Sequence, residues 1–206
     1  MRKVFLLLTL LLVAVAHASD EDRKPCLSAQ PDEAARQRLI LNEGYSILRH
    51  DARTIAALRW LIFIKVESDP YEKLVTDAAE FGRELEDDLD RVAKDYPAVR
   101  IDLDPLPTME RRKRLATGVD KFFDIFPFTG RTGAAYERTV LISLSNGLNQ
   151  ERHLAHELAK EEPDAGLKRL MAETETKMNR LHEQAEDLLE RRYYRAANGS
   201  ENRSSP

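Results

Sequence analysis

The chain has 206 residues, of which 33% are charged, 42% are hydrophobic and 7% are aromatic. That length suffices for one domain with a sizeable core, and the charged, glycine-poor composition favours helices over sheets. The formal net charge of −4 lacks the positive excess typical of nucleic-acid-binding proteins, so we predict no nucleic-acid partner.

The first 18 residues have the three parts of a secretory signal peptide. The basic start MRK is followed by the apolar run VFLLLTLLLVAVA, which is too short to span a bilayer comfortably. The small-residue motif Ala16-His17-Ala18 then provides a cleavage site. We therefore expect cleavage after Ala18 and a periplasmic or secreted protein; an uncleaved membrane anchor is the alternative.

Two polar segments flank the predicted bundle domain, residues 32–194. The leader, residues 19–31, and the tail, residues 195–206, lack the apolar content needed to offset the entropy of ordering, so both are predicted to be disordered. The single cysteine, Cys26, lies in the leader and excludes an intramolecular disulfide. It is interpreted either as a dispensable surface residue or as the link of a disulfide-bonded homodimer.

The first half of the domain is predicted to contain two long helices. The first is predicted from near Asp32 to Ser68, because apolar residues recur at helical spacing from Leu41 to Val66, with an interruption at Gly44 or at His50-Asp51 as the alternative. Within this helix the segment LRWLIFIKV, residues 58–66, is apolar nearly all round and should be the most buried part, with a buried strand as the competing interpretation. The second helix is predicted from the N-cap Asp69, which precedes a proline, to just before Pro97.

A proline-bounded crossover, residues 97–107, separates the two halves and is followed by a short basic helix, MERRKRLATGVDKFFDIF. The third long helix is predicted from about Ala134 to Glu162, and the fourth from Pro163-Asp164 to about Tyr194. The short connection EEPDAG makes these two helices antiparallel neighbours. The sequence thus predicts an all-α, up-down four-helix bundle with a long crossover and one extra short helix.

This order of elements resembles a family of secreted bacterial ferritin-like four-helix domains of unknown function. The resemblance covers roughly residues 55–190 and is carried by Tyr136-Glu137 at the start of the third helix, by Pro163-Asp164 and by His182. It implies a ferritin-like bundle. Metal-binding proteins with that fold use inward-facing carboxylates and Glu-x-x-His pairs.

The chain departs from the ligand pattern that the resemblance implies. The residues three positions before His153 and His182 are Gln150 and Asn179, and Glu-x-x-His occurs nowhere in the sequence. We therefore expect a bundle that keeps the fold without the metal site.

Histidines in the third and fourth helices are the candidate metal ligands. His153 and His156 lie three positions apart, which places them on one side of a helix. With His182 and a carboxylate such as Glu67, they form the candidate set for zinc, iron or copper, because such a site needs three or four converging ligands. The preferred interpretation is a solvated helix face with no cofactor.

The short helix offers a second candidate site, a contact with a partner or with lipid. Its basic cluster comprises Arg111, Arg112, Lys113 and Arg114. The aromatic run FFDIFPF follows and begins with Phe122 and Phe123. We prefer that these phenylalanines close one end of the bundle; if they are exposed instead, residues 109–128 form an apolar and basic contact surface.

These patterns favour a non-enzymatic periplasmic or secreted protein, such as a binding scaffold or a stress-protective scaffold of the cell envelope. Its partner would be an unidentified protein or envelope component. One alternative is a ferritin-like metal-binding protein. Another is a membrane-peripheral or partner-docking module acting through residues 109–128. No nucleophile motif is present, because Cys26 lies in the leader and the serines of ISLSNG lack a glycine elbow.

Overall fold

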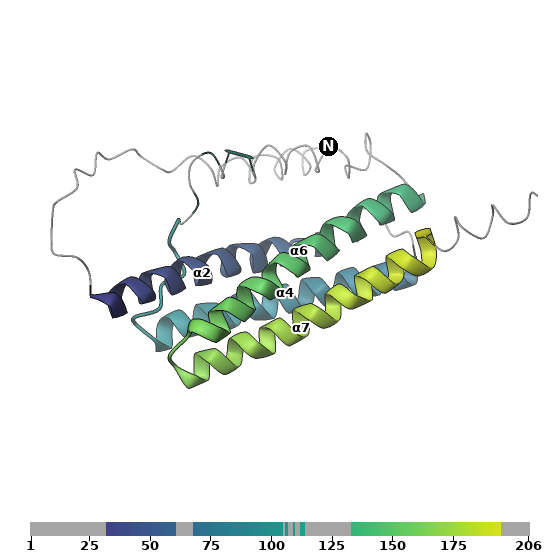
Figure 1. Ribbon diagram of the computed structural model, residues 1–206. Coiled ribbons are helices and arrows are strands. Elements are labelled where there is room, and N and C mark those ends of the chain that lie inside the picture. The colour runs from purple at the N-terminus through teal and green to yellow at the C-terminus, as the bar shows by residue number, and fades with distance from the viewer. Residues whose placement is uncertain are drawn as a thin grey trace, which may run out of the picture. The chain divides into compact units, whose positions relative to one another are not determined.

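The computed structural model confirms the predicted all-α four-helix bundle (Figure 1). It describes residues 32–60, 68–104, 106, 109, 112–113 and 133–194. Within these residues the chain forms four α-helices and no strand. The helices are α2 (Glu33–Ala56), α4 (Asp69–Asp95), α6 (Gly133–Glu161) and α7 (Ala165–Leu189), which is continued by a π-helical turn, η1 (Glu190–Tyr194).

The helices form two antiparallel hairpins, α2 with α4 and α6 with α7, which pack against each other (Figure 1). The start of α2 lies beside the end of α6, where Gln37 Nε2 donates to the Glu161 carbonyl at 3.2 Å. The start of α4 lies beside the start of α6, where the Ser68 hydroxyl donates to Glu137 at 2.9 Å. Helices α4 and α6 therefore run in the same direction, so residues 96–132 return the chain to the opposite end of the bundle.

Helices α4 and α7 bury the apolar faces that their spacing predicts. An inward stripe at intervals of three and four residues is what one face of an α-helix provides. In α4 the predicted residues that are buried are Leu74, Ala78, Phe81, Leu85, Leu89 and Val92. In α7 they are Leu167, Met171, Met178, Leu181, Ala185 and Leu188.

Two helix starts show how local sequence directs the chain. Helix α7 begins at the predicted signal, where Asp164 Oδ1 accepts the backbone N–H groups of Gly166 and Leu167 at 2.9 Å each. Helix α4 corrects the prediction, because Ser68 and not Asp69 occupies the N-cap. The Ser68 hydroxyl makes no capping bond and donates to Glu137 instead. Ser68 therefore uses its hydroxyl to join α4 to α6 and not to cap α4.

Helix α2 ends inside the predicted first helix. The Ala57 N–H still donates to the Arg53 carbonyl at 3.1 Å, and the Leu58 N–H then donates to the Ile55 carbonyl with i+3 spacing at 3.0 Å. Helical conformation resumes at residues 59–60. Trp60 is 62% exposed, so the start of segment 58–66 is not the most buried part of the fold. Residues 61–67, including Glu67, lie outside the described residues.

The α2–α4 hairpin brings two backbones into direct contact at Gly82. A Cβ atom at this position would lie 2.7 Å from the Ala52 carbonyl oxygen and 2.7 Å from the Ala56 amide nitrogen. Such a separation is shorter than van der Waals contact allows, so the packing of this hairpin requires glycine.

The first part of the crossover is tied to α2 by two buried polar residues. Asn42 Nδ2 donates to the Ala98 carbonyl, and Asn42 Oδ1 accepts the Arg100 N–H, both at 3.1 Å. Ser46 Oγ accepts the Leu103 N–H at 3.1 Å. These bonds satisfy irregular backbone that has no helical partners. The predicted short helix lies outside the described residues, except for helical positions at 109, 112 and 113.

Candidate functional site

Helix α6 carries a buried stripe that includes acidic residues. The stripe follows helical spacing from Glu137, the fifth residue of the helix, to Glu162, directly after its last residue. The two glutamate side chains are only 1% and 0% exposed. Burying a carboxylate costs free energy unless the group is paired and hydrogen-bonded, so the partners of these residues are informative. They define one polar cluster at each end of α6.

The Glu162 cluster consists of Glu162, Arg38 and Tyr45. Arg38 donates twice, through Nη2 to Oε1 at 2.8 Å and through Nη1 to Oε2 at 3.1 Å. The Tyr45 hydroxyl donates to Oε2 at 2.9 Å. Bidentate pairing with an arginine is among the strongest hydrogen-bonded ion pairs that a carboxylate forms. Both carboxylate oxygens are therefore fully used.

The protonation states of Tyr45 and Arg38 follow from their contacts with Glu162. Burial, and then the charge of Glu162, raises the pKa of Tyr45 far above its usual value. The hydrogen bond to Glu162 raises the pKa of Arg38. The cluster is therefore a fixed ion pair with a protonated tyrosine, and it joins the start of α2 to the α6–α7 turn.

The Glu137 cluster, at the other end, consists of Glu137, Ser68, Arg192 and Tyr193. The Ser68 hydroxyl donates to Oε2 at 2.9 Å. Arg192 Nε lies 3.4 Å from Oε1, and the Arg192 side chain is 40% exposed. Oε1 accepts no hydrogen bond from any residue that the structure describes. This carboxylate is thus less completely satisfied than that of Glu162.

Tyrosine side chains line the same end of the bundle. Tyr71 and Tyr136 are buried and meet edge to face, with ring centroids 6.2 Å apart. The buried hydroxyl of Tyr193 forms no hydrogen bond of normal geometry within the described part of the chain. Burial, and then the charge of Glu137, nevertheless raises the pKa of Tyr193 to about 12.

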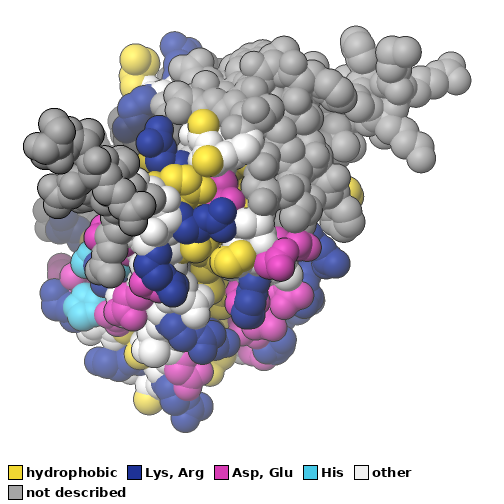
Figure 2. All heavy atoms as spheres, turned by 90° about the vertical axis from the view of Figure 1, so that its right-hand side faces the viewer, with side chains coloured by type: hydrophobic (Ala, Val, Ile, Leu, Met, Phe, Trp, Pro, Cys, Tyr) yellow, Lys and Arg dark blue, Asp and Glu magenta, His cyan; other side chains and the backbone are white. Residues whose placement is uncertain are grey.

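Arg192 and Tyr193 both belong to the π-helical turn η1. Consecutive residues of an α-helix point about 100° apart, so one carboxylate would rarely meet both. The wider π turn changes that geometry, and such turns are frequent at functional sites. Figure 2 views the bundle from this end and shows basic and acidic side chains mixed around hydrophobic ones that remain visible.

The histidines predicted as metal ligands lie on α6 and α7. His153 and His156 are exposed on α6, and His156 Nδ1 lies 3.1 Å from Glu175 Oε1. His182 is half-buried on α7, with Nδ1 3.1 Å from the Ser145 hydroxyl. Since positions 145 and 156 are about 16 Å apart along α6, the structure does not bring His182 together with the other two.

Within the described ranges no group of three or more His, Cys, Asp or Glu residues is placed to hold a metal ion. Glu67 lies outside those ranges, so the metal-binding interpretation stays a prediction.

Helices α6 and α7 are instead joined by pairs of polar side chains that lie about one to two helical turns apart. We call this row of contacts the polar seam. Ser145 meets His182 and also donates to Glu186, and Arg152 Nη1 donates to Asn179 Oδ1 at 2.7 Å. Because each pair joins matching positions of the two helices, the seam fixes the register of the hairpin.

The predicted partner or lipid contact is only partly described. Arg112 and Lys113 are exposed, and Met109 is 72% exposed. The other predicted contact residues, Arg111, Arg114, Phe122 and Phe123, lie outside the described residues. No helix in the described part of the chain has the length and hydropathy needed to cross a bilayer.

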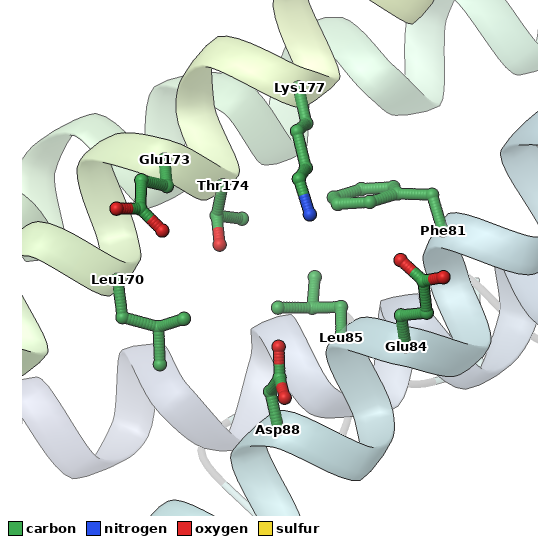
Figure 3. A pocket seen from close by; sticks show the side chains of 8 residues that line it. All are labelled: Phe81, Glu84, Leu85, Asp88, Leu170, Glu173, Thr174 and Lys177. Carbon is green, nitrogen blue, oxygen red and sulfur yellow. The ribbon is translucent and has the colours of Figure 1, made fainter.

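A shallow hollow between α4 and α7 has a volume of about 40 Å³, enough for a few water molecules (Figure 3). Phe81, Leu85 and Leu170 provide its apolar surface. The Lys177 amine points toward the Phe81 ring, 5.9 Å from its centroid, as Figure 3 shows. The hollow is far smaller than the pockets that enclose organic ligands.

Sequence reasoning singled out Glu137 only through its pairing with Tyr136, and it missed Glu162, Ser68 and Arg192. The signal that identifies both glutamates is their position on the apolar stripe of α6, where a charged residue must find a partner. Comparison of the chain with protein-family models, curated proteins and solved structures finds no match. The resemblance to ferritin-like domains therefore stays a prediction.

Proposed function

We propose that this protein is a non-enzymatic helical-bundle scaffold of the periplasm or extracellular space, which acts by binding another envelope component. The supporting observation is that Glu137 and Glu162 are each held by residues of other helices. In metal-binding bundles of ferritin type, interior acids converge on a shared centre. Here the two acids lie about 37 Å apart along α6 and each pairs with an arginine.

The extracytoplasmic location rests on the signal-peptide pattern of residues 1–18. The test is the intact mass of the protein recovered from periplasmic and secreted fractions. We expect a mass that lacks residues 1–18. A full-length protein confined to the cytoplasm would refute the location.

Metal analysis of the purified mature protein separates a scaffold from a metal-binding bundle. We expect far less than one equivalent of zinc, iron or copper after growth with each metal supplied. Stoichiometric metal that is lost in His156→Ala, but kept in the control His50→Ala, would replace the scaffold by the metal-binding function. His50 suits the control because it is exposed on a different helix, α2.

A second candidate function, membrane or partner contact through residues 109–128, is favoured by the exposure of Met109 and Arg112. Co-sedimentation with anionic and neutral vesicles tests it. Binding to anionic vesicles that is lost when the basic residues of Arg111–Arg114 are neutralised supports a lipid contact, because basic clusters are drawn to anionic surfaces. Absent binding, or binding unchanged by neutralisation, removes this candidate.

A further inference from the structure

The carboxylate of Glu137 has unused capacity to accept hydrogen bonds. One oxygen takes the Ser68 hydroxyl, and the other faces a single Arg192 nitrogen at 3.4 Å, beyond the usual length of a charged hydrogen bond. A guanidinium can give a carboxylate two parallel N–H donors, as Arg38 gives Glu162. An almost fully buried acid at the end of the bundle is thus only partly neutralised.

The residue that neutralises Glu137 is carried by the last described turn of the chain. Within η1 the neighbours of the two contacting residues take no part: Arg191 pairs with Asp187 on its own helix, and Tyr194 is 47% exposed. Only Arg192 and Tyr193 face Glu137, and Arg192 remains 40% exposed. The turn η1, called the strap below, therefore covers the Glu137 carboxylate and supplies Arg192, the cation that pairs with it.

We propose that the Glu137 cluster is a binding site for a guanidinium or ammonium group, that Arg192 is its resident occupant, and that η1 is the strap that delivers this occupant. The fitting ligand is an arginine or lysine side chain of a partner. When such a group takes the place of Arg192, η1 is released from the bundle. The inference goes beyond the scaffold role and does not depend on the cellular location.

The chemistry of the cluster selects for a planar cation. Glu137 supplies the negative charge, and Ser68 holds one oxygen so that the other keeps its direction. A planar guanidinium can give one carboxylate two parallel N–H donors and is weakly hydrated, whereas a compact ammonium ion is strongly hydrated. We therefore expect guanidinium to bind more tightly than methylammonium.

Removal of the resident side chain provides the test. Arg192→Ala and the control Arg191→Ala are compared by thermal unfolding in guanidinium chloride from 0 to about 50 mM, at ionic strength held constant with sodium chloride. We expect guanidinium to raise the Tm of Arg192→Ala saturably by about 2–4 °C and to leave that of Arg191→Ala unchanged. Equal responses of the two variants would overturn the proposal.

Further measurements distinguish guanidinium binding at Glu137 from a general effect of guanidinium on stability. Adding Glu137→Gln to Arg192→Ala should abolish the response to guanidinium, and a persisting response would contradict the assigned site. Hydrogen exchange should quicken at residues 190–194 in Arg192→Ala and not in Arg191→Ala. If Arg192→Ala does not fold, the same exchange measurement on Arg192→Gln decides, since glutamine keeps a polar side chain without the cation, and unchanged protection of η1 would refute the strap.

Discussion

The two ends of helix α6 each bury a glutamate, but they hold it in different ways. Glu162 receives two N–H donors from Arg38 and a hydroxyl from Tyr45, all at 3.1 Å or less. Glu137 receives one hydroxyl and a longer contact from a partly exposed arginine. Both carboxylates are removed from water to the same degree, so the difference between the two ends lies in their partners.

The origin of those partners explains the difference. Arg38 belongs to the second turn of the 24-residue helix α2 and is 24% exposed, and the same helix supplies Tyr45. Arg192 projects from a terminal turn, where protein chains open most easily. A buried acid paired with a well-anchored helix therefore stabilises the fold, whereas one paired with a terminal turn leaves room for a competing cation.

The largest expected effect compares the two arginines. Arg38→Met keeps the apolar stem but leaves Glu162 buried without its cation, so we expect a loss of about 3 kcal/mol in the free energy of unfolding. Arg192→Met removes a longer, partly solvated contact and should cost about 1 kcal/mol. Urea unfolding of both variants provides the comparison. Equal costs, or the reverse order, would show that the two ends do not differ as described.

A second prediction asks whether the Glu137 end is weaker because the α2–α4 hairpin is loosely packed. Gly82→Ala would place a methyl group against the Ala52 and Ala56 backbone and should destabilise the fold by about 2 kcal/mol. Gly147→Ala is the control, because a Cβ there meets no atom within 4 Å and should stabilise α6 by about 0.5–1 kcal/mol. An unchanged free energy of unfolding in Gly82→Ala would mean that the two backbones move apart at little cost and that the hairpin is loosely packed.

The tyrosine hydroxyls give a third comparison. Tyr45→Phe removes a buried 2.9 Å hydrogen bond to a charged group and should cost about 1.5–2 kcal/mol. Tyr193→Phe removes a hydroxyl without a normal hydrogen bond in the described structure, so we expect a change within about 0.5 kcal/mol. Chemical unfolding with Tyr194→Phe as a further control checks this contrast. An equal loss of unfolding free energy in Tyr193→Phe and Tyr45→Phe would contradict this contrast.

The smallest effect concerns alkaline pH. The pKa of Tyr193 is raised from 10.0 to about 12 by burial and by Glu137, so its folded form keeps the proton that the unfolded chain releases. This contribution to stability is complete below pH 10 and is lost as the pH rises toward 12. Unfolding free energies measured across this window should fall less steeply for Tyr193→Phe than for the wild type. Identical slopes would contradict the raised pKa.

Much of the fold could be predicted from local patterns. The stripes of α4 and α7 and the cap at Asp164 depend on residues three or four positions apart, and the structure reproduces them. The end of α2 could not be predicted in this way. Periodicity continues beyond Ala56, yet the hydrogen bonds change from i+4 to i+3 spacing there.

The polar clusters were harder to predict because their partners are distant in the sequence. Glu162 meets Arg38 across 124 positions. Nothing in the residues around Arg38 distinguishes it from the other arginines of the chain. The histidines stood out in the sequence because few residue types bind metals, but His153 and His156 proved to be exposed. The more useful signal was a charged residue at a core position of α6 or directly after it, as Glu137 and Glu162 are.

A pair of double-mutant cycles tests the unequal pairing of the two glutamates most directly, since each cycle separates the pair energy from lost packing. One cycle combines Arg38→Met with Glu162→Gln, and the other combines Arg192→Met with Glu137→Gln. We predict a coupling energy of about 2–3 kcal/mol for the first pair and at most about 1 kcal/mol for the second. Equal coupling in the two cycles, or stronger coupling at Glu137, would contradict the account.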